Sequence, residues 1–63
     1  MVKALTICLL SVSTGTCSER VTKYYFDDGE HACKPFTYTG CGGNGNNFDT
    51  YEDCYAACIN IGK

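Results

Sequence analysis

Six cysteines in a chain of 63 residues constrain the fold more than any other feature of the sequence. A chain this short buries only about 60% of the surface that its unfolded form exposes, so a hydrophobic core alone leaves it marginally stable. Disulfide bonds make up this deficit in small proteins, and they persist in oxidising compartments. We therefore expect a disulfide-rich domain that is secreted and extracellular.

A zinc site is the competing use for the cysteines. Structural zinc sites are typically built from C-x-x-C pairs or from paired histidines. The chain has no C-x-x-C pair, and His31 is its single histidine. We therefore predict disulfides, with no bound metal and no cofactor. Six cysteines allow fifteen pairings, and their positions alone do not choose among them.

The charge balance excludes several classes of partner. Five basic and seven acidic residues give a net charge of −2. Nucleic acids and anionic membrane surfaces attract basic faces. No apolar run in the sequence approaches the length of a membrane span. We expect no nucleic-acid binding and no membrane insertion, and we expect a monomer.

Residues 1–10, M-V-K-A-L-T-I-C-L-L, imitate a signal peptide because Lys3 precedes a short apolar stretch. Cleavage after this segment would remove Cys8 and leave five cysteines, an odd number for a secreted domain. We therefore expect these residues to remain in the mature fold, as part of a single domain over residues 1–63.

Two segments are typical of β-strands. Residues 21–27, V-T-K-Y-Y-F-D, and residues 32–38, A-C-K-P-F-T-Y, are rich in β-branched and aromatic side chains. Between them, D-D-G-E-H has the composition of a turn, in which Gly29 can adopt a positive φ. The two segments predict a β-hairpin, in which Pro35 limits the pairing because it has no N–H group.

A short helix is predicted near the C-terminus. Thr50 is a favourable N-cap, and Asp53 follows it by three residues, as in a capping box. Cys54 and Cys58 are four residues apart, so both should face the same side of the helix. One short helix would then anchor two disulfides.

Residues 40–47, G-C-G-G-N-G-N-N, superficially resemble a phosphate-binding loop. The Lys-Ser/Thr pair of such loops is missing, and no helix follows directly. We expect an irregular segment whose backbone packs closely against its neighbours.

The spacing of the cysteines is C-x8-C-x15-C-x7-C-x12-C-x3-C. This spacing resembles the Kunitz domain of the pancreatic trypsin inhibitor family at every interval. The intervening sequence is similar too: Y-Y-F-D, then F-T-Y-T-G-C-G-G-N-G-N-N-F, then E-D-C-x-x-x-C. The resemblance covers the core of the domain, residues 8–58.

The resemblance implies a small disulfide-rich α+β fold, with a twisted two-stranded antiparallel hairpin and a C-terminal helix. It implies the disulfides Cys8–Cys58, Cys17–Cys41 and Cys33–Cys54, of which Cys17–Cys41 is exposed. It also matches Asn46 to a buried amide that satisfies backbone groups. Four aromatic residues match core positions of the family: Tyr24, Phe36, Tyr38 and Phe48.

The resemblance further implies inhibition of a serine protease, by a rigid loop that occupies the active site as a substrate would. Ser18 would enter the primary specificity pocket, and Ser18–Glu19 would be the reactive bond. The implied binding loop consists of Gly15, Thr16, Cys17, Ser18, Glu19, Arg20 and Val21. The implied secondary loop consists of Thr39, Gly40 and Cys41.

Three residues depart from the family pattern. Ser18 stands where trypsin inhibitors carry Lys or Arg, so the acidic pocket of trypsin would remain unpaired. Glu19 replaces Gly or Ala and would bring a carboxylate into the centre of the contact. Thr39 replaces glycine and would add a branched side chain to the same face. We therefore expect an elastase-like or subtilisin-like target, whose primary pocket is small, in preference to trypsin.

Three other functions compete with inhibition. Catalysis by Ser18 is not expected, because His31 lies at the far end of the predicted hairpin and no other base is evident. Kunitz proteins that block ion channels generally carry cationic side chains, whereas this chain is acidic. A binding module without inhibitory activity would explain Glu19 and Thr39. The channel-modulator and binding-module hypotheses stay open.

Overall fold

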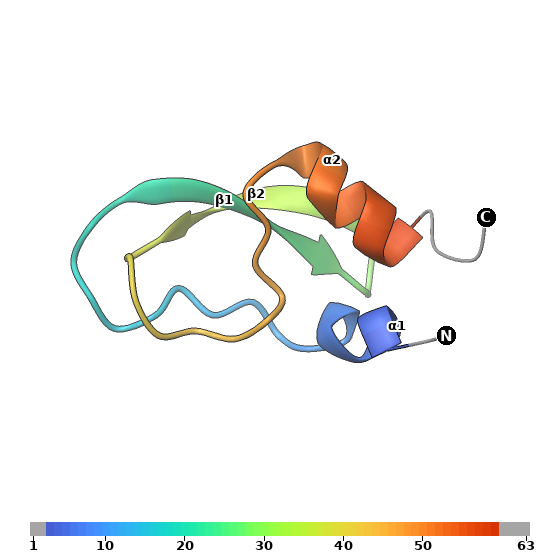
Figure 1. Ribbon diagram of the computed structural model, residues 1–63, viewed down its shortest axis with the longest axis horizontal. Coiled ribbons are helices and arrows are strands. Elements are labelled where there is room, and N and C mark those ends of the chain that lie inside the picture. The colour runs from blue at the N-terminus through green and yellow to red at the C-terminus, as the bar shows by residue number, and fades with distance from the viewer. Residues whose placement is uncertain (1–2, 60–63) are drawn as a thin grey trace.

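The computed structural model describes residues 3–59, and the rest of the predicted domain, residues 1–2 and 60–63, lies outside this part. The first helix, α1 (Lys3–Cys8), is followed by two strands, β1 (Val21–Asp27) and β2 (Ala32–Tyr38). The chain then forms α2 (Tyr51–Cys54), which continues directly as a π-helix, η1 (Tyr55–Ile59). Figure 1 shows the hairpin along the length of the molecule, with the helices gathered at one end.

The predicted hairpin is confirmed with both of its strands. β1 and β2 pair antiparallel, from Val21 opposite Tyr38 to Asp27 opposite Ala32. Pro35 lies opposite Tyr24, whose N–H and C=O both bond to Phe48 on the other side, at 2.9 and 2.8 Å. Tyr24 and Pro35 therefore form a pair that exchanges no hydrogen bonds, and the missing N–H of proline removes none from the sheet.

The turn between the strands differs from the prediction. Gly29 does not adopt a positive φ; instead His31 has a φ of 54°. The Asp27 carboxylate accepts hydrogen bonds from the amides of Gly29 and Glu30, at 2.9 and 3.2 Å. Asp27 thereby fixes the first part of the turn, and the left-handed residue falls where the chain enters β2. The ring of His31 contacts Phe26 edge-on, with centroids 5.2 Å apart.

The C-terminal helix begins as predicted but winds differently after one turn. The Thr50 side chain accepts a hydrogen bond of 3.0 Å from the Asp53 amide, which confirms the N-cap. The α-helix ends at Cys54, and η1 continues with wider π-helical turns. Cys54 and Cys58 are both buried, so their predicted common side is confirmed.

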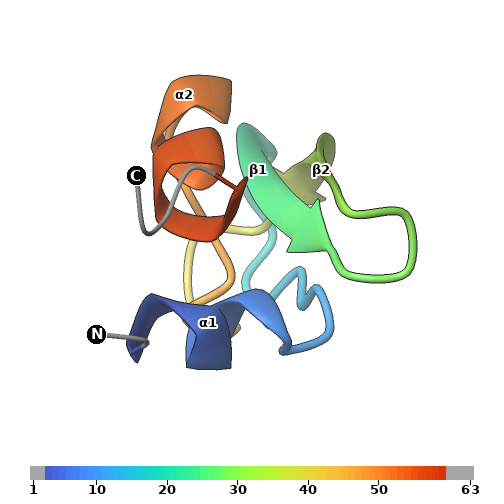
Figure 2. The same ribbon diagram turned by 90° about the vertical axis from the view of Figure 1, so that its right-hand side faces the viewer.

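The N-terminal helix was not predicted. Figure 2 shows α1 alongside the C-terminal helical segment, to which Cys8 is joined by the disulfide with Cys58. Cys8 is 1% exposed and forms part of the buried core. Within residues 3–59, no helix has the length and apolar content needed to cross a bilayer.

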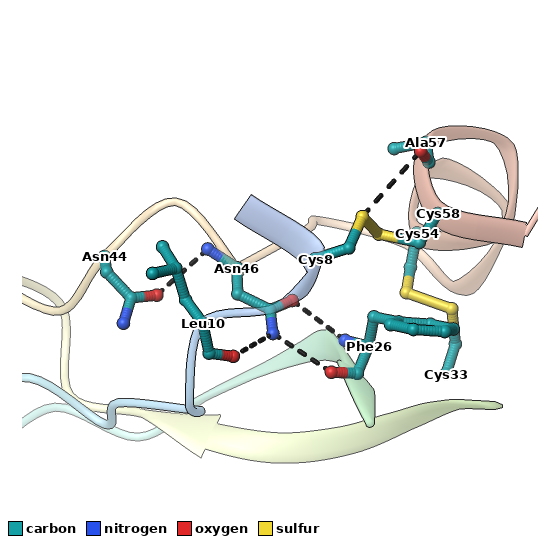
Figure 3. Close-up of a disulfide and its surroundings, with 9 residues drawn as sticks. All are labelled: Cys8, Leu10, Phe26, Cys33, Asn44, Asn46, Cys54, Ala57 and Cys58. Carbon is teal, nitrogen blue, oxygen red and sulfur yellow. Dashed lines mark hydrogen bonds between the residues drawn. A yellow bond between two sulfur atoms is a disulfide. The ribbon is translucent and has the colours of Figure 1, made fainter. Parts of the chain in front are cut away.

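The three implied disulfides, Cys8–Cys58, Cys17–Cys41 and Cys33–Cys54, are all present. Two of them build the core together with Phe26, as Figure 3 shows. Tyr24 and Phe48 pack against this core, as predicted. Apart from the cystines, Phe26 is the one buried apolar side chain among the described residues, so the disulfides compensate for a small core.

The prediction that Phe36 and Tyr38 belong to the core is wrong. Side chains alternate between the two faces of a strand, and Cys33 occupies the core-facing side of β2. Phe36 and Tyr38 are an odd number of residues further along, so both lie on the opposite face. There they are half-buried, and Phe36 contacts Tyr25 and Tyr38 edge-on.

Asn46 satisfies buried backbone groups, as predicted, and is 1% exposed. Its Oδ1 accepts a hydrogen bond from the Phe26 amide at 2.8 Å. Its Nδ2 donates to the carbonyl oxygens of Leu10 and Phe26, at 2.8 and 3.0 Å (Figure 3). One side chain thus joins three segments: the chain after α1, strand β1 and the glycine-rich segment, residues 40–47.

Candidate functional site

The two loops predicted to bind a protease lie together at the end of the molecule away from the helices (Figure 1). The molecule measures 37 × 18 × 17 Å, and this end is one tip of its long axis. Gly15 is half-buried, whereas the rest of the binding loop is exposed: Thr16, Cys17, Ser18, Glu19, Arg20 and Val21. The secondary loop, Thr39, Gly40 and Cys41, runs beside it.

The Cys17–Cys41 disulfide joins the two loops covalently, one residue before Ser18. The Thr16 amide adds a hydrogen bond of 3.0 Å to the Cys41 carbonyl oxygen. Gly15 allows this approach, since it has a φ of +88° and a Cβ there would overlap the Cys41 carbonyl oxygen. A residue with a side chain at position 15 would therefore separate the loops.

The backbone of Thr39 bonds to the chain before and after Ser18. Its amide donates to the Thr14 carbonyl oxygen at 2.8 Å, and its carbonyl oxygen accepts from the Glu19 amide at 2.9 Å. Ser18 lies between these attachments and is exposed, and the N–H of its peptide bond to Glu19 is held by Thr39.

We expected Thr39 to add its side chain to the face that contacts a protease. In the structure its hydroxyl points into the binding loop instead. The hydroxyl donates to the Thr14 carbonyl oxygen at 2.6 Å and accepts from the Cys17 amide at 3.1 Å. Thr39 is accordingly half-buried. No sequence pattern indicated this rotamer, which depends on a neighbouring loop.

Glu19 lies along the secondary loop. A Cβ added at Gly40 would be 3.2 Å from Oε1 of Glu19 and 3.4 Å from its Cβ. Gly40 also has a φ of +107°, which favours glycine. The exposed carboxylate of Glu19 therefore rests against Gly40, a contact that the sequence did not reveal.

The glycine-rich segment is irregular, as expected, and packs against the chain next to both loops. Gly42 and Gly43 have positive φ values of 79° and 81°. The Tyr38 hydroxyl donates to the Gly42 carbonyl oxygen at 2.8 Å, and the Asn44 side chain donates to the Ser11 carbonyl oxygen at 2.9 Å. These bonds connect the segment to β2 and to the chain that leads into the binding loop.

The ion pairs of the described residues lie away from the loops. Lys23 pairs with Asp49, and Lys34 pairs with Asp27 and Glu30, at 3.2 and 2.7 Å. The hydrogen bond from Lys34 lowers the pKa of Asp27, and the Glu30 amide adds to this effect. Glu30 and then Asp27 raise the pKa of Lys34. Asp27, Glu30 and Lys34 stabilise the hairpin turn, and Glu19 and Arg20 are the charged side chains of the binding loop.

The described residues supply no catalytic or metal-binding constellation. Ser18 precedes β1, and His31 follows the turn at the other end of that strand, so the pair is too far apart to form a nucleophile and base. Between residues 3 and 59, no three His, Cys, Asp or Glu side chains gather in a way that could hold a metal ion.

Two larger proteins contain a similar domain. Papilin of Drosophila melanogaster is 51% identical over 51 residues, which are 81% of this chain and 2% of papilin. Tissue factor pathway inhibitor 2 of Homo sapiens is 50% identical over 56 residues, which are 89% of this chain and 24% of that protein. The chain thus spans less than two thirds of the length of either relative.

The fold is also found in channel-blocking toxins. One solved structure, described in terms of pore-modulating toxins that block K+ channels, superimposes on this chain with a TM-score of 0.84 at 33% identity. The match covers 86% of this chain and 92% of that one. Homologues therefore include a protein named as an inhibitor and a channel toxin. The family profile described as "Kunitz/Bovine pancreatic trypsin inhibitor domain" matches residues 7–59. The chain belongs to this family of Kunitz-type serine protease inhibitors, and it is not an enzyme.

Proposed function

We propose that this domain is secreted and inhibits a serine protease with a small primary pocket, such as an elastase-like or subtilisin-like enzyme. Residues 15–21 form the contact loop, with Ser18 in the primary pocket and Ser18–Glu19 as the reactive bond. Residues 39–41 form the secondary contact. The domain acts as a monomer and folds as a single unit over residues 1–63.

One observation carries this proposal: the exposed Ser18–Glu19 bond is flanked on both sides by attachments to the secondary loop. Cys17 is held by its disulfide and Glu19 by the carbonyl oxygen of Thr39. A loop that is already rigid loses little conformational entropy on binding, which favours a tight complex. Cleavage of a bond whose two ends are both held is also readily reversed.

Ser18 decides the class of target. The tightest protein complexes reach about −18 kcal/mol, and losing a central charged anchor removes about 5–8 kcal/mol. Glu19 at the contact adds a desolvation cost of about 2–4 kcal/mol. Subtracting both costs leaves about −6 to −11 kcal/mol, a range centred on a roughly micromolar affinity for trypsin. A small pocket strands no buried charge opposite Ser18, so the same loop is better suited to it.

Titration of the oxidised domain against trypsin, chymotrypsin, pancreatic elastase and subtilisin tests the proposal. We expect submicromolar inhibition of elastase or subtilisin and at most weak inhibition of trypsin. A domain that leaves all four enzymes active at tens of micromolar contradicts inhibition of this general kind. The channel-modulator and non-inhibitory binding-module hypotheses would then lead.

A further inference from the structure

We propose that the Thr39 hydroxyl is a noncovalent clamp that positions the reactive bond independently of the Cys17–Cys41 disulfide. Thr39 would thus be a positioning residue, one that acts on the protease contact through the binding loop. This inference rests on the proposed function, and it goes further by assigning a role to a side chain that the family pattern does not contain.

The hydrogen bonds of the hydroxyl leave it no freedom to rotate. Its one proton goes to the Thr14 carbonyl oxygen at 2.6 Å, and its oxygen accepts the Cys17 N–H at 3.1 Å. The first bond fixes the chain before the binding loop, and the second fixes the residue that precedes Ser18. The glycine found in the family at this position can make neither bond.

The surrounding backbone leaves room for this side chain. Among the described residues, His31 is the one non-glycine with a positive φ, so Thr39 lies outside the left-handed region that favours glycine. Gly15 supplies the space, because a Cβ there would lie 2.8 Å from Oγ1 of Thr39. Gly15 and Thr39 are therefore complementary: the missing side chain of one makes room for the hydroxyl of the other.

The clamp does not need the disulfide. The Cys17 N–H and the Thr39 hydroxyl keep their hydrogen-bonding capacity when the Cys17 sulfur is unpaired, and so do Thr14 and Glu19. The Cys17–Cys41 disulfide lies at the exposed tip, whereas the cysteines of the other two disulfides are at most 9% exposed. A reductant would open the exposed disulfide first, and we infer that the loop keeps its shape when that occurs.

Amide hydrogen exchange of Cys17, followed by NMR, tests the clamp without any protease. In Thr39→Val, which keeps the shape but loses the hydroxyl, we expect the Cys17 amide to exchange about threefold to tenfold faster. Thr39→Ser, which keeps the hydroxyl, should preserve slow exchange. Thr37→Val is the matched control, because it makes the same chemical change at an exposed position of β2. It should leave Cys17 exchange unchanged.

The same variants in a Cys17→Ala/Cys41→Ala background test independence from the disulfide. The amide of residue 17 should remain protected in this background, both alone and combined with Thr39→Ser, and should lose that protection when Thr39→Val is added. Urea unfolding confirms that each variant is folded through its two remaining disulfides. The rate at which catalytic amounts of subtilisin cleave the reactive bond should rank the variants as amide exchange does. Cleavage should be fastest for the variant that carries Thr39→Val.

Exchange of the residue 17 amide that is unchanged by Thr39→Val, in both backgrounds, overturns the clamp. Fast exchange in Thr39→Ser also overturns it, because packing of the threonine methyl group would then explain the protection. Inhibition distinguishes the two proposals: a wild-type domain with a protected Cys17 amide that inhibits no protease contradicts the proposed function and leaves the clamp in place.

Discussion

The amide nitrogen of Glu19 lies 2.9 Å from the carbonyl oxygen of Thr39. In the proposed function this nitrogen is the leaving group of the reactive bond. After cleavage, the new amine of Glu19 would remain beside Thr39, and the new carboxylate of Ser18 would remain attached to the disulfide through Cys17. Two ends held this close favour resynthesis over release, since proximity replaces the entropy of a bimolecular encounter.

Ser18→Lys should convert the domain into a trypsin inhibitor. The lysine supplies the cation that the acidic pocket of trypsin requires, so we expect affinity for trypsin to rise about a thousandfold or more. Ser11→Lys, at another exposed serine, is the control and should give no gain. Equal trypsin affinity for the two variants would show that Ser18 is not the primary specificity residue.

Gly15→Ala should disorder the binding loop and leave the core intact. Position 15 requires a positive φ, and an added Cβ would overlap the Cys41 carbonyl oxygen, so we expect a cost of about 1–3 kcal/mol. Exchange of the Thr16 amide, which bonds to Cys41, should accelerate about tenfold. In Gly29→Ala the new Cβ would lie 3.3 Å from its nearest neighbour, an Asp27 side-chain oxygen. If this control accelerated Thr16 exchange equally, the effect would not be local.

Asn46→Ala should destabilise the whole domain. The substitution leaves the Phe26 amide and the carbonyl oxygens of Leu10 and Phe26 without partners, so we expect a loss of about 3–5 kcal/mol in urea unfolding. The neighbouring Asn47 makes no side-chain hydrogen bond to the described residues, so Asn47→Ala should cost much less. Similar losses from the two variants would refute a special role for Asn46.

Lys34→Gln should raise the pKa of Asp27. In the native domain this pKa lies below the ordinary value of 3.8, chiefly because of Lys34. The ionised form of Asp27 therefore stabilises the turn fully above pH 3.8, and this contribution is lost as pH falls through the folded pKa. Carboxyl carbon NMR measures the pKa directly.

Lys23→Gln is the control for this titration, because Lys23 pairs with Asp49. An Asp27 pKa that responds equally to both lysine variants would indicate a general charge effect. For Lys34, whose pKa is raised above 10.5, the stabilising contribution is full below that pH and is lost as pH rises through the folded value.

Local sequence chemistry and the family resemblance together predicted the hairpin, the start of the C-terminal helix and the disulfides. β-branched and aromatic residues fixed both strands, Thr50 fixed the start of α2, and the resemblance supplied all three disulfide pairings. The strands and the helix start depend on neighbours in sequence, so they can be predicted from local composition. The disulfide pairings join distant residues, and the family resemblance was needed to predict them.

The details of the candidate site depend on contacts between segments that are distant in sequence. The Thr39 hydroxyl finds its partners 25 and 22 residues away, and Glu19 lies against Gly40 across the two loops. Phe26 lies opposite Cys33 in the hairpin and shares its core-facing side. Phe36 is three residues beyond Cys33 on the same strand, so it faces the other way. The rotamer of a side chain and the face it occupies depend on packing between distant segments. Residue identities alone therefore do not predict them.

Mapping of the bond that a protease cleaves tests the central claim most directly. The domain is incubated with catalytic amounts of elastase or subtilisin, and the product is analysed by mass spectrometry before and after reduction. We predict a gain of one water in the oxidised protein, slow cleavage at Ser18–Glu19, and partial resynthesis of that bond. Rapid cleavage elsewhere, or a Ser18–Glu19 bond that is hydrolysed quickly and completely, would contradict the assignment of this loop as an inhibitory reactive site.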